Sequence, residues 1–168
     1  VKQILFDLGF HKPKAVGVKV DSDGEEFTIR GKEMILCAGA IGSPQILMLS
    51  GVGPKSHLEE HDIDCIVDSP GVGQNLRDHP NIGLLWPYAD GFSVGPDQPR
   101  YQVILRYTAP GSSHRNDMQV FFSSFATPRV DRGGDGMTSL GIAMQPVLNL
   151  AKSQGTLSLR SADPHEQP

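Results

Sequence analysis

The sequence predicts an α+β fold, with a mixed first region followed by a region of antiparallel strands. Three features predict it: a turn at Asp23-Gly24 between two strand-like runs, a strand–turn–helix pattern over residues 33–51, and short apolar runs separated by Gly and Pro beyond Asn81. The change of pattern near residue 80 divides the chain into two expected domains, residues 1–80 and residues 81–168.

The first region should begin with three short strands. Apolar, β-branched runs predict them at residues 4–6, 15–20 and 26–30. Phe27 and Ile29 alternate with polar neighbours, which is typical of a strand with one buried face.

Residues 34–38 are continuously apolar, which predicts a strand buried on both faces. Small residues follow, and then a helix for which Ser43 suits the N-cap, Pro44 the first helical position and Gly51 the position after the end. A helix N-terminus suits a phosphate group, although the small residues would equally allow tight packing of strand against helix. The dinucleotide fingerprint G-x-G-x-x-G is absent from the sequence.

In the second region the expected strands are residues 82–86, 101–107, 118–122, 139–144 and 156–159.

Composition excludes some classes of partner. Lys and Arg total 15 and Asp and Glu total 19, which gives a net charge of −4 and no basic surface for nucleic acid. No apolar run approaches the roughly 18 residues of a transmembrane segment. Cys37 and Cys65 lie in apolar runs and are expected to be small buried residues in a reducing, cytoplasmic compartment.

His57, Glu60 and His61 fit the H-x-x-E-H pattern of a class of zinc hydrolases. The segment has room for only about two helical turns, and no third ligand is marked downstream. A polar surface turn is therefore the favoured interpretation, with a zinc hydrolase as the alternative.

Residues 33–54 closely resemble the second signature of the glucose–methanol–choline (GMC) oxidoreductases, in which Gly-Ser-Pro and a hydrophobic helix precede Ser-Gly-hydrophobic-Gly. Residues 70–80 are similar to the family stretch PGVG-x-NL-x-DHP, and residues 155–164 to a late G-x-x-L-R-S-x-D-P. The resemblance implies a flavoprotein that oxidises a small-molecule alcohol, as choline dehydrogenase does, by hydride transfer to FAD, with oxygen or another electron acceptor. It also implies an internal fragment: residues 1–80 would be the late part of an α/β FAD-binding domain, and residues 81–168 the front of an antiparallel-sheet substrate-binding domain.

The resemblance assigns six residues to the cofactor. The backbone of Val1 would contact the adenine of FAD, Ala38, Gly39 and Ala40 would form a turn close to the cofactor, and Ser43 and Pro44 would begin the next helix. Asn75, Asp78 and His79 match a loop near the domain junction, to which no role is assigned.

None of the six histidines matches the family's catalytic motif, so no residue is assigned to catalysis and none to a metal. The chain alone is therefore expected to bind FAD weakly or not at all and not to turn over substrate. A truncated, non-catalytic remnant of the family is the alternative.

Overall fold

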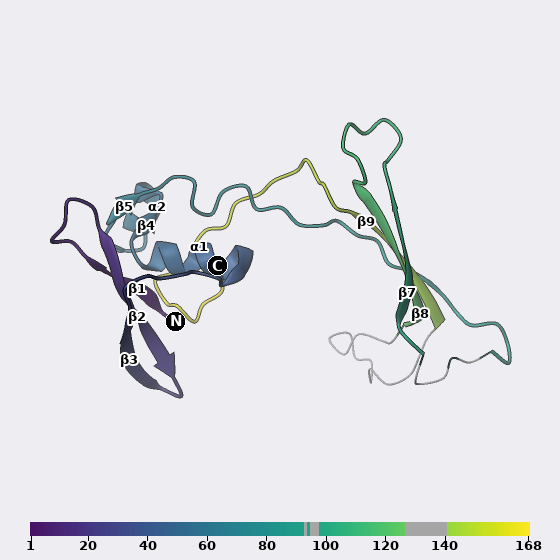
Figure 1. Cartoon of the computed structure of the whole chain (residues 1–168), viewed down its shortest axis with the longest axis horizontal. Coiled ribbons are helices and arrows are strands. Elements are labelled where there is room, and N and C mark those ends of the chain that lie inside the picture. The colour runs from purple at the N-terminus through teal and green to yellow at the C-terminus, as the bar shows by residue number, and fades with distance from the viewer. Residues whose placement is uncertain (93, 95–97, 127–140) are drawn as a thin grey trace. The chain divides into compact units, whose positions relative to one another are not determined.

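The computed structural model describes residues 1–92, 94, 98–126 and 141–168, and they form two compact units. Unit 1 comprises Val1–Leu76 together with Gln154–Pro168, and unit 2 comprises Arg77–Ser153 (Figure 1). We call Gln154–Pro168 the return segment, which is drawn in yellow in Figure 1. The chain thus leaves unit 1, builds unit 2 and comes back.

Unit 1 begins with a three-stranded antiparallel sheet in the order β1-β2-β3. Its strands are β1 (Gln3–Asp7), β2 (Lys14–Ser22) and β3 (Glu25–Arg30), which confirms the three predicted strands. Asp23 and Gly24 both have positive φ, 53° and 84°, as the tight turn predicted there requires. The predicted half-burial of the last strand is wrong, because every residue of β3 is exposed.

Helix α1 (Gly39–Leu49) follows, and it differs from the prediction in two ways. Residues 33–38 are not a strand, and Ile35 is 82 % exposed, because no strand within the described residues pairs with this segment. The helix also starts four residues before the expected N-cap, so Ser43 and Pro44 lie inside it. Gly39 allows the early start, since its φ of +80° suits only glycine without strain.

The rest of unit 1 surrounds a small apolar core. A parallel pair, β4 (Val52–Gly53) and β5 (Val67–Asp68), flanks the short helix α2 (Lys55–Glu59). The core consists of Met48, Leu58, Leu157 and Leu159. Both cysteines are free thiols; Cys65 packs against this core, whereas Cys37 is exposed, contrary to the prediction, because the strand expected to bury it does not form.

Unit 2 is built on a four-stranded antiparallel sheet in the order β6-β9-β8-β7. The strands are β6 (Leu84–Trp86), β7 (Tyr101–Tyr107), β8 (Met118–Ala126) and β9 (Gly141–Leu148), in agreement with four of the predicted strands. Residues 139 and 140 of the predicted fourth strand lie outside the described residues. The helices and antiparallel sheets agree with an α+β fold.

The fifth predicted strand of the second region, residues 156–159, does not form and belongs to unit 1. Residues 156–159 join no sheet, and the return segment packs with unit 1 instead of unit 2. The reason is the alternation of Leu157 and Leu159, which fills the core of unit 1 rather than a face of the second sheet.

Across the part of the chain that the structure describes, we find no helix with the length and apolar character needed to cross a membrane.

Candidate functional site

Five of the six predicted cofactor residues, all except Val1, lie at the start of α1. We call Ala38–Gly42 the helix-opening turn. Ala38, Gly39 and Ala40 are exposed in it, and apart from the adjoining residues and helix backbone no atom lies within 4 Å of the position that a Cβ on Gly39 would take. The hydroxyl of Ser43 accepts a hydrogen bond from the N–H of Ala38 at 3.1 Å, and so fixes the turn against the first residues of the helix.

The chemistry of this turn fits an anionic group. Helix α1 has 11 residues, its N-cap Ala38 has no side-chain cap, and its first turn contains no acidic side chain. Its leading N–H groups and the positive end of its dipole favour negative charge, and a small-residue surface lets a bulky ligand come close. The pyrophosphate of FAD is a group that such a turn can accept.

Val1 is not brought to this turn by any contact that the described residues show. It is 59 % exposed and precedes β1, and β1 is joined to the opposite, C-terminal end of α1. There the buried hydroxyl of Ser50 accepts the N–H of Ile4 at 2.7 Å and donates to the carbonyl of Ile46. Sequence reasoning missed this role of Ser50, because its partner Ile4 lies 46 positions away.

His57 has a structural partner on the return segment. Its Nε2 atom accepts a hydrogen bond from the N–H of Leu159 at 2.9 Å, which occupies the lone pair that a zinc ion would need. Its Nδ1 atom is 3.6 Å from a carboxylate oxygen of Glu60, and its ring meets the ring of His61 edge-on. Among the described residues, no group of three or more His, Cys, Asp or Glu side chains could hold a metal ion. The geometry supports the polar turn and gives no support to the zinc alternative.

The three loop residues near the junction make local contacts. Asn75 adopts a positive φ of 61°, and a carboxylate oxygen of Asp78 accepts the N–H of His79 at 2.7 Å. Asn75 belongs to unit 1, whereas Asp78 and His79 belong to unit 2. All three side chains are exposed, and these contacts point to loop geometry rather than to a shared site.

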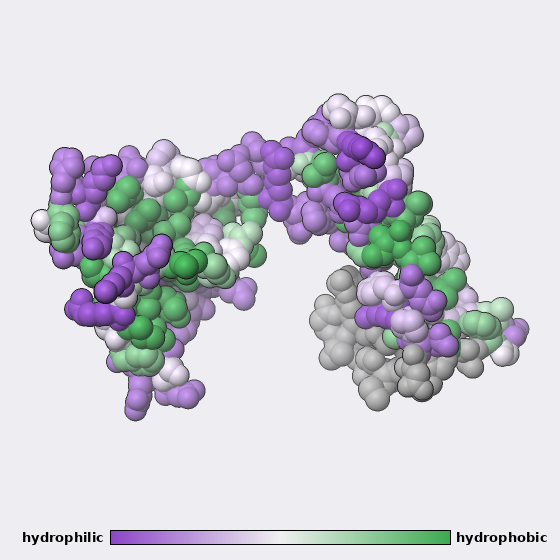
Figure 2. All heavy atoms as spheres, viewed as in Figure 1, coloured by the Kyte–Doolittle hydropathy of each residue, from purple (hydrophilic) through white to green (hydrophobic). Residues whose placement is uncertain are grey.

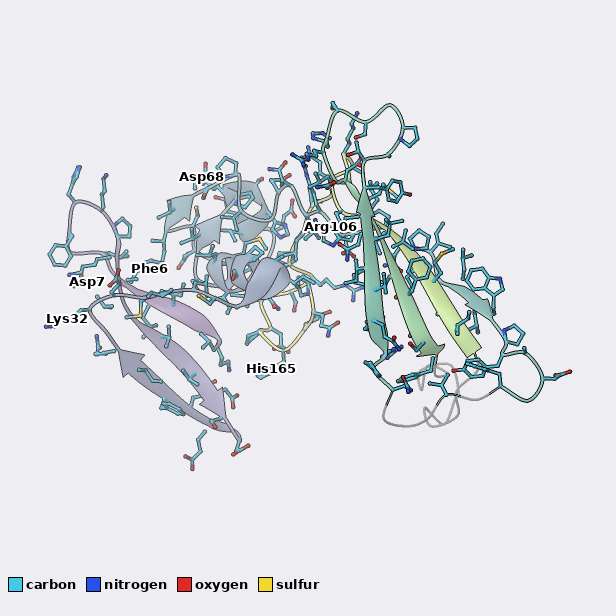
Figure 3. The ribbon with its side chains drawn as sticks, turned by 45° about the vertical axis from the view of Figure 1, so that its right-hand side comes forward. Phe6, Asp7, Lys32, Asp68, Arg106 and His165 are labelled. Carbon is cyan, nitrogen blue, oxygen red and sulfur yellow. The ribbon has the colours of Figure 1, made fainter. Side chains whose placement is uncertain are left out.

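Unit 2 carries an apolar cavity of about 510 Å³ on one face of its sheet. Phe122 of β8 lies opposite Val103 and Met144, and Trp86 of β6 lies opposite Ile142. Residues that are directly opposite, or two apart along a strand, share a face, so all five project to the same side. Apolar residues gather over the strands of this unit in Figure 2, and side chains leave both faces of the sheet in Figure 3.

The polar groups beside the cavity are already paired with one another. The amide of Gln102 donates to the hydroxyl of Ser124 at 2.9 Å, and the hydroxyl of Ser123 donates to the carbonyl of Phe125. The described lining contains no charged side chain: Trp86, Gln102, Val103, Phe122, Ser123, Ser124, Ile142, Ala143 and Met144. This surface is suited to the uncharged carbon skeleton of a small molecule.

A second, more polar cavity of about 460 Å³ lies between the hairpin that joins β7 to β8 and the segment that follows β9. Asp117, which is only 4 % exposed, accepts the N–H of Ala109 at 2.9 Å across that hairpin. Hydrogen bonds from Ser112 and from the Ala109 backbone lower the pKa of this carboxyl below its usual value. The carboxylate is therefore fully used in closing the hairpin.

Comparisons with known proteins agree on one family. A family model described as GMC oxidoreductase matches residues 1–81. Choline oxidase of Arthrobacter globiformis is 36 % identical over 171 residues, which cover 99 % of this chain and 31 % of that protein. The chain thus spans about a third of the length of the curated relatives it matches.

Solved structures agree on the fold. A crystal structure of formate oxidase matches with a TM-score of 0.78 at 24 % identity, over 99 % of this chain and 37 % of that one. Pyridoxine 4-oxidase from Mesorbium loti matches with a TM-score of 0.75 at 21 % identity, over 99 % and 32 % of the two chains.

Proposed function

Since the chain belongs to the glucose–methanol–choline (GMC) oxidoreductase family, we propose that it contributes one cofactor contact and one substrate wall to an FAD-dependent oxidase or dehydrogenase of alcohols. Unit 1 would be part of the FAD-binding domain and unit 2 part of the substrate-binding domain. The observation that carries the proposal is the 36 % identity to choline oxidase along 99 % of the chain.

On the cofactor side, the proposal assigns FAD to the helix-opening turn. The N–H groups at the start of α1 would face an anionic part of the cofactor, and the open space at Gly39 would let it approach. Ala38, Ala40, Ser43 and Pro44 would shape this contact, and the exposed backbone of Val1 would contact the adenine. When bound, FAD supplies the acceptor for the hydride that leaves the carbinol carbon, and the electrons pass on to oxygen or another acceptor.

On the substrate side, the proposal assigns the apolar cavity of unit 2 to the carbon skeleton of the alcohol. Trp86 and Phe122 present apolar surface, and each buried methylene contributes roughly 0.8 kcal/mol of binding. The described lining residues carry no charge, so a cationic substrate would meet only the aromatic faces of Trp86 and Phe122 and would lack a counter-ion. An alcohol with an uncharged skeleton is therefore the favoured substrate class.

The test uses the full-length polypeptide that contains this chain. We expect the purified protein to show the visible spectrum of bound flavin, and an alcohol added without oxygen to bleach it. Choline and 3,3-dimethylbutan-1-ol form a matched pair, since they have nearly the same shape and differ in the positive charge. We expect the neutral alcohol to have the higher kcat/KM.

Two kinds of result would contradict this proposal in whole or in part. A protein without flavin, or one whose flavin no alcohol reduces, would contradict the oxidoreductase proposal and favour a non-catalytic remnant. A preference for choline would contradict the uncharged substrate class alone.

Replacement of the cavity residue Trp86 by Ala should raise KM for the neutral alcohol about tenfold, the equivalent of roughly 1.4 kcal/mol, with little effect on the flavin spectrum.

A further inference from the structure

The return segment is seated on α2 by one long-range hydrogen bond. Leu159 is only 5 % exposed, and its N–H finds its acceptor in Nε2 of His57, 2.9 Å away and 102 positions earlier in the sequence. A buried N–H left without an acceptor is costly. The bond requires the tautomer with its proton on Nδ1, the atom that faces Glu60.

A second backbone contact holds the same stretch. The N–H of Leu157 donates to the carbonyl of Gly73 at 2.7 Å. Gly73 has a φ of +82°, and a Cβ there would lie 2.2 Å from the carbonyl oxygen of Leu157. Only glycine allows the two backbones to come this close, so the seat of the return segment is specific in its geometry.

From this seat the return segment reaches one face of α1. Leu157 and Leu159 share the core with the fully buried Met48 of α1. The side-chain amide of Gln45 donates to the carbonyl of Glu166 at 2.8 Å. Gln45 and Met48 are three positions apart and therefore lie on the same face of the helix.

Nearer its end, the return segment also meets the sheet of unit 1. His165 projects from it in Figure 3, with its Nε2 atom 3.6 Å from a carboxylate oxygen of Asp21 on β2. The segment is thus attached to α2, α1 and β2, and α1 opens with the turn that holds the candidate cofactor residues.

We propose that the return segment is a clamp on α1, and that His57 is the positioning residue that seats this clamp and so sets the affinity of the helix-opening turn for FAD. The part that concerns FAD depends on the proposed function. The part that concerns the seat does not. His57 need not touch the cofactor, because it acts through Leu159, the shared core and α1.

The experiment compares two substitutions in the full-length protein. His57→Leu removes the acceptor, whereas His57→Gln keeps an acceptor oxygen on a side chain of similar length. We expect the Leu159 amide to exchange slowly in the wild type and in His57→Gln, and quickly in His57→Leu. We expect the Kd for FAD to rise about tenfold in His57→Leu and to change less than about threefold in His57→Gln.

The matched control is His61→Leu, which removes a neighbouring ring but no bond to Leu159. It should leave both the amide exchange and the Kd unchanged. If His57→Leu does not fold, Gln45→Ala takes its place, since it removes only the bond to Glu166 and should weaken FAD binding about threefold.

Slow exchange of the Leu159 amide in His57→Leu would contradict the claim that His57 holds the return segment in place. Fast exchange of the Leu159 amide in His57→Leu with an unchanged Kd for FAD would contradict the proposed effect of His57 on FAD binding. A wild-type protein that binds no flavin would overturn the proposed function together with that coupling, while the exchange of Leu159 would still decide the seat.

Discussion

The hydroxyl of Ser50 joins two elements that are far apart in the sequence. It is 3 % exposed, it accepts the N–H of Ile4 on β1, and it donates to the carbonyl of Ile46 on α1. β1 is an edge strand, so this N–H has no partner on a further strand within the described residues. One side chain thereby provides a hydrogen-bond partner for a backbone N–H of the edge strand and for a carbonyl near the end of the helix.

Replacing Ser50 by Ala should lower the free energy of unfolding by about 1–3 kcal/mol, because the N–H of Ile4 would stay buried without an acceptor. Urea unfolding followed by circular dichroism measures the change. Ser56→Ala, at an exposed position of α2, is the control and should stay within about 0.5 kcal/mol of the wild type. Equal effects of the two substitutions would contradict the role given to Ser50.

Residues of this kind are hard to predict from sequence. Ser50 and Ile4 are 46 positions apart, and Gln45 and Glu166 are 121 apart, so no local pattern connects them. Gly39, Ala40 and Ser43, in contrast, could be selected because residues 33–54 resemble a family signature that is continuous in the sequence.

Among the elements, the sheet β1-β2-β3 is held together on its surface by Glu26. Its carboxylate on β3 pairs with Lys19 on β2 and with Lys2, which directly precedes β1. These two partners, Lys19 foremost, lower the pKa of Glu26 from 4.5 to about 2. The network spans all three strands of the sheet.

The pH dependence follows from this shift. Because the pKa of Glu26 is lower in the folded than in the unfolded chain, its contribution to stability is complete above pH 4.5 and is lost as the pH falls toward about 2. NMR titration of the Glu26 carboxyl carbon should give a midpoint well below 4.5, and added salt should raise it. In Glu26→Gln, stability should fall less over this pH range than in the wild type. An equal fall would show that other groups cause the loss of stability.

The elements that sequence predicts well here are those whose partners are close in the chain. The turn at Asp23-Gly24 and the strand β7 both follow from local patterns. Residues 33–38 were predicted as a buried strand, and that prediction failed because a strand depends on pairing with a neighbour that local sequence cannot supply.

For the whole molecule, the central feature is that unit 2 departs from and returns to one place. Leu76 and Gly155 form an antiparallel bridge with hydrogen bonds in both directions, of 3.0 and 2.8 Å. Such a doubly bonded pair is the pair that closes a two-residue hairpin. The structure of unit 1 therefore does not require a long connection at this point.

We expect that replacing residues 77–154 by Asn-Gly leaves unit 1 folded, since the two residues can join Leu76 to Gly155 in a hairpin turn. Slow amide exchange of Met48 and Leu58, which the shortened protein and its control both contain, measures this. A matched variant that ends at Leu76 lacks both leucines of the core and should be unfolded or greatly weakened. If both proteins behave alike, the return segment does not complete unit 1.

The sequence shows a change of pattern near residue 80, but it does not show where the chain returns to unit 1. Leu157 and Leu159 alternate with polar residues as they would in one more strand of the second sheet. Nothing local to them shows that the face they fill belongs to Met48 and Leu58, about a hundred positions earlier. Composition thus marks where the chain changes, and only the structure shows where it returns.

The bond between His57 and Leu159 has a consequence for biosynthesis. A ribosome makes the chain from its N-terminus, so His57 leaves the exit tunnel 102 residues before its partner does. During that interval Met48 and Leu58 lack the two core partners Leu157 and Leu159, and the entropy of closing so long a loop delays the final docking. The nascent protein should therefore be most vulnerable to proteases from the emergence of Leu58 until the return segment has emerged.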